Sequence, residues 1–453
     1  MFCSACFGPM QPGDAYCGRC GAASQADSAG RPSAPSAPGE DPVGIAPLAR
    51  PVRHRTAGWL VGVVAVVVMV VVAAPVVWRP QDLVPAPSPS TTPSAAPVVR
   101  LPVTMDVGRG HACRVGVDGK VACWGANDSG QLGIGVRSAG STRPVTVAGL
   151  DAPVTALSAG GGHTCALTTV GEVWCWGANS SGQLGDGTTE PSGVPVRVLG
   201  LAGAAVDVAA GDSHTCAVMQ TGGVACWGSN SVGELGDGRA LPSAEGDGGT
   251  DVTDQPRQSS APVDVVGLTT GVVAVSAGVS HTCAITVAGG VTCWGDDFWG
   301  QLGDGVALVP VDGVRRTSTP VDVVGLTSGV VVVAAGSTHT CALTSTGGVL
   351  CWGANEQGQL GDGTRAIYQD EKSSSAQGPL GRSVPGAVVG LTSGVTAIAV
   401  GVGLGLALTS DGSIVAWGDD SYGLVSQAPT GKGFTAIAAG LGLGLALKDD
   451  GTV

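Results

Sequence analysis

The first residues whose types and spacing suit chemistry are four cysteines near the N-terminus. They form two pairs with two residues inside each pair, Cys3 with Cys6 and Cys17 with Cys20. Two such thiolate pairs suit the tetrahedral coordination of one Zn²⁺, and so short a segment needs a metal to stay folded. Two disulfides or a redox-active pair are the alternatives. Zinc is favoured in a reducing compartment, so we expect a structural Zn²⁺ cofactor in residues 1–22.

Ten further cysteines recur as five pairs, and the two members of each pair are ten residues apart. Cys165 and Cys175 lie symmetrically about a turn centred on Val170, so an antiparallel hairpin would place them opposite each other, roughly 4.5–5.5 Å apart between Cα atoms. In a sixth copy Leu406 and Ala416 replace both cysteines together. This joint loss favours five disulfides in an oxidising compartment; the alternative is ten free thiols used as small apolar side chains. The pairs are Cys113–Cys123, Cys165–Cys175, Cys216–Cys226, Cys283–Cys293 and Cys341–Cys351.

Each cysteine pair belongs to a longer repeated sequence. In the second copy, residues 163–187 read H-T-C-A-L-T-T-V-G-E-V-W-C-W-G-A-N-S-S-G-Q-L-G-D-G. A repeat that recurs at intervals of roughly fifty residues or more, with apolar segments between glycine-rich turns, is typical of a propeller. Four short apolar segments bounded by Gly or Pro predict four strands per copy. In the second copy these are residues 154–159, 163–167, 173–176 and 195–199.

The repeats comprise six full copies and a half copy. The sixth ends at Trp417 and lacks cysteine, and residues 440–453 supply half of a seventh. The compound motif H-T-C-A-L, V-x-C-W-G and N-x-x-G-Q-L-G-D-G resembles the regulator of chromosome condensation (RCC-type) repeat family. The resemblance covers about residues 100–453 and implies an all-β propeller of about seven blades. The cysteine pairs resemble those of bacterial, secreted members, and residues 1–22 resemble the zinc-ribbon of many bacterial membrane proteins.

The repeated polar residues argue against catalysis. A side chain that occurs once per blade is expected to be structural, through a hydrogen bond to neighbouring backbone or stacking beside the motif tryptophan. The aspartates of L-G-D-G are expected to be turn residues. No G-x-S-x-G or H-E-x-x-H motif occurs, so we expect no enzyme. The repeated histidines are His111, His163, His214, His281 and His339. The repeated aspartates are Asp186, Asp237, Asp304 and Asp362.

An uncharged, valine-rich segment at residues 58–78 separates the two groups of cysteines. Its length suits a bilayer's hydrocarbon core of roughly 30 Å, and Trp59 and Trp78 stand near its ends as interfacial aromatics do. A buried strand pair and a cleaved signal peptide are the alternatives. A transmembrane helix is favoured.

The charges beside this segment predict its orientation. Arg50, Arg53 and Arg55 precede the segment, whereas Arg79 alone follows closely. The positive-inside rule then places the N-terminus in the cytoplasm and the repeats outside the cell, which suits both groups of cysteines.

The sequence therefore predicts a single-pass membrane protein with five segments. They are a zinc-ribbon at 1–22, a disordered Ala/Pro/Ser linker with a basic edge at 23–57, a transmembrane helix at 58–78, a Pro-rich stalk at 79–100 and the propeller at 101–453. Residues 97–101, P-V-V-R-L, resemble the fourth-strand segment P-V-R-V-L at 195–199, so we expect them to close the ring. An incomplete last blade is the alternative.

The charge balance weighs against nucleic acid as a partner. The chain carries a net charge of −13, and residues 1–100 hold seven basic and five acidic side chains. Because 22 basic and 35 acidic residues occur overall, the repeats hold fifteen basic and thirty acidic ones. An acidic propeller is a poor match for phosphate backbones.

Binding specificity is expected where the copies differ. Long loops follow the L-G-D-G position at residues 239–262, 306–320 and 364–385. The first is acidic, but its spacing matches no known calcium loop, and a solvated loop is favoured. The fourth copy has an aromatic pair where other copies have small polar residues; anchoring a partner and packing against the next blade are equal alternatives. The candidate binding residues are Phe298, Trp299, Arg315, Arg316, Tyr368 and Tyr422.

These features favour a cell-surface propeller that binds an extracellular protein or a cell-wall ligand without catalysis. Two alternatives remain open. One is guanine-nucleotide exchange on a small GTPase, which the resemblance implies and which needs a cytoplasmic propeller. The other is an extracellular enzyme acting on cell-wall polymer, which would need acid and base residues that break the repeat symmetry.

Overall fold

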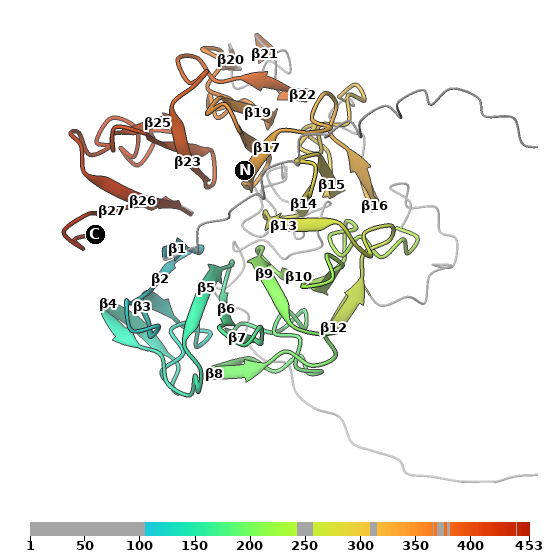
Figure 1. Cartoon of the computed structure of the whole chain (residues 1–453), viewed down its shortest axis with the longest axis vertical. Helices are drawn as coiled ribbons and strands as arrows, with labels where there is room; N and C mark the ends of the chain where they lie inside the picture. Colours follow the sequence, from blue (N-terminus) through green and yellow to red (C-terminus); the bar gives the residue numbers. More distant parts are fainter. Residues whose placement is uncertain are drawn as a thin grey trace, which may run out of the picture.

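The computed structural model describes residues 105–241, 257–308, 315–365, 367–368, 376–377, 381–440 and 442–453. The predicted zinc-binding cysteines, the apolar segment, the stalk and the closing strand at 97–101 all lie outside these residues. Among the described residues, no helix is long and apolar enough to cross a membrane. The described chain forms antiparallel sheets arranged in a ring (Figure 1).

Each complete blade has an inner, a second, a third and an outer strand in chain order. The inner strands are β1 (Met105–Val107), β5 (Val154–Ala159), β9 (Ala205–Ala210), β13 (Val272–Ala277), β17 (Val330–Ala335), β23 (Val395–Val400) and β26 (Phe434–Ala439). The second strands are β2 (His111–Val115), β6 (His163–Thr168), β10 (His214–Met219), β14 (His281–Thr286), β18 (His339–Thr344), β24 (Leu404–Thr409) and β27 (Gly444–Lys448).

The third and outer strands complete most, but not all, of the blades. The third strands are β3 (Val121–Asn127), β7 (Val173–Gly177), β11 (Val224–Ser229), β15 (Val291–Asp296), β19 (Val349–Ala354) and β25 (Ile414–Gly418). The outer strands are β4 (Ser138–Thr146), β8 (Ser192–Arg197), β12 (Gln258–Asp264), β16 (Arg316–Asp322) and β22 (Gly381–Ala387). A small sheet of β20 (Ile367–Tyr368) and β21 (Ala376–Gln377) lies within the loop between β19 and β22.

The prediction of an all-β propeller is confirmed, and the blade count differs slightly from seven. Blades 1 to 5 have four strands, blade 6 has the three strands β23 to β25, and β26 and β27 form a two-stranded seventh sheet. The described residues therefore hold six blades and a partial sheet.

The predicted disulfides are confirmed, and each joins the second and third strands of one blade. Cys165 pairs with Cys175 in the β6–β7 register, and a disulfide links them with 4.1 Å between their Cα atoms. The same bond forms in the other four bridged blades. In blade 6, Leu406 stands opposite Ala416 in the same register, as the joint substitution predicted.

Two motif glycines allow backbone contacts that no side chain would permit. Gly177, at the end of W-C-W-G, has a φ of 107°, and a Cβ there would lie 2.5 Å from the Gly162 carbonyl oxygen. Gly185, in Q-L-G-D-G, has a φ of 69° and lies against the indole of Trp227 in the next blade. The motif thus encodes both the close turn and the packing between blades.

The two ends of the described ring meet through packing. Met105 and Val107 on β1 form a core cluster with Ala438 on β26, and Leu443, Leu445 and Leu447 pack against it. A Cβ on Gly440 would lie 2.5 Å from the Gly108 carbonyl oxygen, so the two turns are in close contact. Blade 1 and the seventh sheet therefore lie side by side (Figure 1).

Candidate protein-binding face

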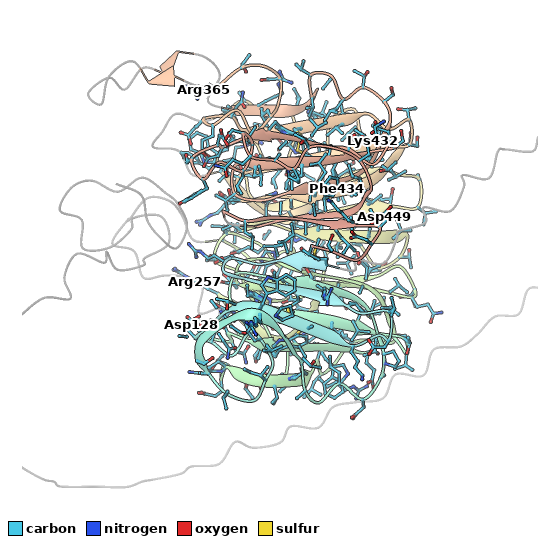
Figure 2. All side chains as sticks on the ribbon, turned by 90° about the vertical axis from the view of Figure 1, so that its left-hand side faces the viewer. Asp128, Arg257, Arg365, Lys432, Phe434 and Asp449 are labelled. Carbon is cyan, nitrogen blue, oxygen red and sulfur yellow. A yellow bond between two sulfur atoms is a disulfide. The ribbon has the colours of Figure 1, made fainter. Side chains whose placement is uncertain are left out.

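The variable loops lie on one end of the propeller. Because the strands alternate in direction, the connections between third and outer strands all emerge at the same end as the turns between inner and second strands. Figure 2 shows Asp128, Arg257 and Arg365 from three of these connections on one side, and Lys432 and Asp449 on the other. We call the first end the loop face. It includes residues 128–137, 178–191, 297–308, 355–365 and 419–423.

The loop face rests on a polar contact between neighbouring blades. His163 Nε2 lies 2.9 Å from Thr215 Oγ1 of the next blade, and Thr215 Oγ1 donates to the Gln183 carbonyl at 2.9 Å. Trp227 Nε1 donates to the same carbonyl at 2.9 Å. Since the threonine hydrogen is committed to Gln183, the histidine donates through Nε2. We call this arrangement the His–Thr seam.

The His–Thr seam occurs between four pairs of blades. Burial lowers the pKa of His111 to about 4 and the pKa of His163 to about 3, so the imidazoles are neutral at physiological pH. The histidine partner is a threonine of the next blade, rather than the neighbouring backbone or the motif tryptophan that the sequence suggested. The pairs are His111–Thr164, His163–Thr215, His214–Thr282 and His281–Thr340.

The contact between blades 5 and 6 lacks the His–Thr seam. Gly405 takes the place of the threonine, and a Cβ at that position would lie 2.2 Å from the Trp417 ring. Both ring nitrogens of His339 are buried without a hydrogen-bond partner. Trp417 Nε1 still donates to the Gln359 carbonyl at 3.0 Å, so the tryptophan bond is kept and the threonine bonds are lost.

A buried asparagine organises each regular connection on the loop face. Asn179 Oδ1 accepts from the Leu184 amide at 2.9 Å, and its Nδ2 donates to Asp186 and to the Thr188 carbonyl. Asp186 also accepts from the Thr188 amide at 3.0 Å. The predicted turn role of the L-G-D-G aspartate is therefore confirmed, and its partnership with the asparagine is an addition.

Blade 4 replaces this asparagine by a carboxylate. Asp297 Oδ1 accepts from the Leu302 amide, but in its ionised form Asp297 cannot donate to Asp304 as an asparagine would. The Arg315 guanidinium lies 2.7 Å from Asp297 Oδ2, bonds Asp304, and donates to the Val306 carbonyl. Burial raises the pKa of Asp297 to about 7, although the Leu302 amide and Arg315 oppose the rise. The sequence signal, W-G-D-D in place of W-G-A-N, was visible, but its link to Arg315 was not predicted.

The structure brings the predicted binding residues to the same face. Phe298 and Trp299 are half-buried and meet edge to face, with 5.0 Å between ring centroids. Tyr422 is 73% exposed. Arg316 donates to the Ser231 carbonyl, and Tyr368 lies in β20 within the blade 5 connection. Phe298, Trp299, Arg315, Tyr368 and Tyr422 belong to connections of blades 4, 5 and 6, and Arg316 is the first residue of β16.

The central channel is a second concave feature. It forms a cavity of about 730 Å³, lined mainly by small and apolar residues of the inner strands. At its loop-face end, Arg109 of blade 1 lies 3.6 Å from Asp212 of blade 3. Among the described residues, no group of three or more His, Cys, Asp or Glu side chains is placed to hold a metal ion. The described site therefore offers loops, aromatics and charges for binding a partner.

The chain belongs to the RCC1-like domain family, whose match covers residues 81–430. It is 34% identical over 272 residues to the human E3 ubiquitin-protein ligase HERC2, which is 59% of this chain and 5% of that protein. It is 29% identical over 331 residues to the ultraviolet-B receptor UVR8 of Arabidopsis thaliana, covering 72% of this chain and 67% of the receptor. A third relative is the secretion-regulating guanine nucleotide exchange factor of Bos taurus, at 35% identity, with 52% of this chain and 48% of that protein covered. The chain thus spans only a small part of HERC2 and about half of the exchange factor.

Solved structures agree on the fold. Prp20p from Saccharomyces cerevisiae superimposes with a TM-score of 0.61 at 20% identity, covering 76% of this chain and 83% of that chain. Human WBSCR16 gives a TM-score of 0.59 at 23% identity, covering 76% and 86%. Identity this low supports the shared propeller architecture and no more.

Proposed function

We propose that this chain is a non-catalytic binding protein whose loop face takes up a protein partner. The observation that carries the proposal is that the strands hold the repeated structural residues, whereas the loops hold the residues that differ between copies. The histidine, threonine, cysteine and tryptophan side chains that recur at the motif positions of blades 1 to 5 are committed to packing, seams and bridges. The residues that differ between copies, including Phe298, Trp299 and Tyr422, lie together on one face.

The aromatic and charged side chains of the loop face suit a protein surface. Tyrosine, tryptophan and arginine are the residues that most often dominate binding energy at interfaces. Tyr422 is exposed and offers its ring directly. Arg315 and Asp304 form an ion pair that fixes the turn bearing Phe298 and Trp299, so the pair is presented on a rigid support.

We further propose that the propeller is displayed outside the cell by a transmembrane helix at residues 58–78, with zinc-binding cysteines in the cytoplasm. The support is the agreement of three features read from sequence: the uncharged length, the arginines before it, and the separate cysteine groups. Five disulfides in the propeller suit an oxidising compartment. Labelling of a thiol introduced at exposed Val117 in intact cells, with an impermeant reagent, tests this orientation. Labelling only after lysis would contradict it.

Nucleotide exchange on a small GTPase is the alternative function. It is favoured by the likeness to the secretion-regulating exchange factor and to Prp20p, a structure described with its binding properties to Gsp1p and histones. This alternative predicts that catalytic amounts of the chain accelerate release of a fluorescent nucleotide from a GTPase. If the rate of nucleotide release stays unchanged for every candidate GTPase, nucleotide exchange is contradicted and binding without catalysis is the remaining proposal.

The binding proposal is tested with the full-length chain in detergent as bait. Captured proteins are identified by mass spectrometry, and the affinity of each is measured for two variants. Tyr422→Ala removes an exposed ring from the loop face, and Val170→Ala removes an exposed side chain from the opposite face. We expect the first to weaken binding by at least about tenfold and the second to leave it unchanged. Equal affinities for both variants and the parent would contradict binding through the aromatic loop face.

A further inference from the structure

A tight turn follows the outer strand in blades 3, 4 and 5. In blade 3 the Leu268 amide donates to the Val265 carbonyl at 3.2 Å, and the Leu268 carbonyl accepts from the Val224 amide of the third strand at 2.9 Å. Leu326 and Leu391 make the same two bonds in blades 4 and 5. The turn lies at the end of the propeller opposite the loop face, beside the hairpin between the second and third strands.

Blade 2 has a connection of the same length that does not form this turn. Within the described residues, neither the bond from the Leu201 amide to Val198 nor the bond from the Val173 amide to Leu201 is made. The Val173 N–H also points away from β6, because the flanking pair Thr168–Glu172 is hydrogen-bonded and such pairs alternate along a hairpin. Val173 is 1% exposed, so a bound acceptor would relieve the cost of burying this donor.

Two substitutions explain why blade 2 lacks the tight turn. Glu172 occupies the position of Gly223, where a Cβ would lie 2.9 Å from the Thr269 carbonyl oxygen. Ala204 occupies the position of Gly271, whose φ of 80° is unfavourable for a residue with a side chain. Both changes keep the connection of blade 2 away from its hairpin. The equivalent glycines of blades 4 and 5 are Gly290, Gly329, Gly348 and Gly394.

Blade 1 supports this explanation. It has Lys120 and Pro153 at the two positions, and its described residues likewise lack both bonds of the tight turn. The charges beside the connection differ, because Thr146 stands opposite the third strand where blade 2 has Arg197. An open connection with a carboxylate and a guanidinium beside it is therefore a feature of blade 2 among the five complete blades.

The open connection of blade 2 borders a pocket of about 340 Å³, which is at the small end of the range for small-molecule sites. Its charged side chains are held in place by each other and by an indole. Arg197 lies 3.0 Å from Glu172 Oε1, and Trp174 Nε1 donates to Glu172 Oε2 at 3.2 Å. The Val173 residue and the apolar side chains of Val170, Leu199 and Leu201 also line the pocket.

The polar groups of the pocket define the chemistry of a ligand. In blades 3 to 5 the N–H equivalent to that of Val173 bonds a carbonyl oxygen, so the ligand should supply an oxygen acceptor. Arg197 has five donor hydrogens, of which Glu172 takes up only a part, and a guanidinium favours a carboxylate. Glu172 keeps lone pairs that accept from an ammonium group. Because Glu172 and Arg197 are in contact, the ligand must hold its two charges close together.

We propose that this pocket binds a free α-amino acid with an apolar side chain. Its carboxylate binds Arg197 and the Val173 N–H, and its ammonium group binds Glu172. The side chain packs against Val170 and Leu199, which are 63% and 51% exposed in the unliganded protein. Both charges of an α-amino acid are attached to one carbon atom, and their sum is zero, as is that of the Glu172–Arg197 pair. The pocket and the loop face lie at opposite ends, so the two binding proposals are independent.

Calorimetric titration of the full-length chain in detergent tests the proposal with L-valine, L-leucine and L-phenylalanine. At least one of them should bind, and absence of binding by all three would overturn the proposal. L-leucinamide lacks the carboxylate, and N-acetyl-L-leucine lacks the ammonium group. Each should bind at least about tenfold more weakly than L-leucine. Because these analogues represent the first and last residues of a peptide, an analogue that binds as well as L-leucine would replace the free amino acid by a peptide end.

A matched pair of charge variants locates the site. Arg197→Gln removes the guanidinium, so it should weaken amino-acid binding at least about tenfold and abolish the preference for L-leucine over L-leucinamide. Lys432→Gln makes the same change of charge outside the pocket but at the same end of the propeller (Figure 2), and it should leave binding unchanged. Equal affinities for the two variants would show that the amino acid binds elsewhere.

A second pair of variants tests the origin of the pocket. Glu172→Gly with Ala204→Gly copies blade 3 into blade 2, so Leu201 should then bond the Val173 amide and close the pocket. This variant should keep the circular dichroism spectrum of the parent chain and lose amino-acid binding. Lys120→Gly makes the equivalent change in blade 1 and should leave binding unchanged. Full binding by the blade 2 variant, or equal loss in both variants, would contradict a site formed by the open connection.

Discussion

Blades 1 to 5 and blade 6 follow one repeat but are held together differently. Each of the first five has a disulfide between its second and third strands and an outer strand. Blade 6 has Leu406 and Ala416 in place of the cysteines, Gly405 in place of the seam threonine, and no described outer strand. The covalent, polar and edge contacts disappear together, and the indole of Trp417 occupies the space over Gly405. The comparison predicts a stable ring of bridged blades and a weaker region around blade 6.

Acid should cause the largest loss of stability, and it acts through the histidines of the bridged blades. Their folded-state pKa values lie at about 3 to 4, below the ordinary value of 6.5, because of burial. The unfolded chain binds more protons below pH 6.5, so stability is full above that pH and falls as the pH drops toward 4. By pH 5, protonation of each histidine in the unfolded chain lowers the free energy of unfolding by roughly 2 kcal/mol, which is roughly 10 kcal/mol for the five histidines.

Denaturant unfolding followed by circular dichroism from pH 7.5 to 4.5 checks this expectation. Burial raises the pKa of Asp297 to about 7 and also raises the pKa values of Asp212 and Glu234. These three carboxyl groups change stability in the opposite direction, and three groups do not offset five histidines. His163→Gln should reduce the slope by about one fifth, because one titrating group is lost. A stability that is flat between pH 6.5 and 5 would contradict the neutral, buried state of these side chains.

Removal of one bridge should have the next largest effect. The double variant Cys165→Leu and Cys175→Ala copies the residues of blade 6 into blade 2. It should lower the free energy of unfolding by about 2–3 kcal/mol, because the bridge closes a short loop in the unfolded chain. The converse variant, Leu406→Cys with Ala416→Cys, should raise the melting temperature of blade 6. Calorimetry under non-reducing conditions measures both effects. Equal melting temperatures for the parent chain and the two variants would show that the disulfides do not cause the difference between blades 1 to 5 and blade 6.

Two equivalent histidines should respond differently to the same substitution. His163→Leu removes the donor to Thr215 and should cost about 1–3 kcal/mol. His339→Leu removes a buried imidazole that has no partner, so it should be neutral or stabilising by less than about 1 kcal/mol. Chemical denaturation of the two variants gives the comparison directly. A similar cost at both positions would mean that packing, rather than the His–Thr seam, holds neighbouring blades together.

The loop-face aromatics should have the smallest effects on stability. Tyr422 of blade 6 is 73% exposed, so Tyr422→Ala should change the free energy of unfolding by less than about 0.5 kcal/mol. Trp299 of blade 4 is half-buried against Phe298, so Trp299→Ala should cost about 1–2 kcal/mol. Melting temperatures of the two variants test the difference. A larger loss for Tyr422→Ala would assign it a packing role in blade 6.

Local sequence patterns predicted the hairpins well, because a hairpin register depends only on residues close in the chain. The ten-residue interval between Cys165 and Cys175 placed them opposite each other, as the structure confirms. The partner of His163 was not predictable in this way, since Thr215 comes into contact only through the packing of the next blade. The bond from Arg315 to Asp304 likewise spans a loop whose path the sequence does not define.

The sequence also contains a signal for the incomplete sixth blade, and a count of the repeats does not use it. The interval from Trp417 to Phe434 is shorter than that from Trp176 to Ala205, and the outer strand is what the sixth repeat lacks. The estimate of about seven blades counted motifs rather than complete sheets. The zinc and membrane predictions stay predictions, because their residues lie outside the described chain.

Hydrogen exchange by mass spectrometry on the full-length chain tests the central claim most directly: a ring of bridged blades supports the loop face, and blade 6 is its weak region. Peptides covering the second strands β6, β10, β14 and β18 should exchange slowly and together. Peptides from β24 and β25 should exchange at least about tenfold faster, because they lack the bridge, the His–Thr seam and the outer strand. Protection of β24 and β25 equal to that of β6 and β7 would contradict the account.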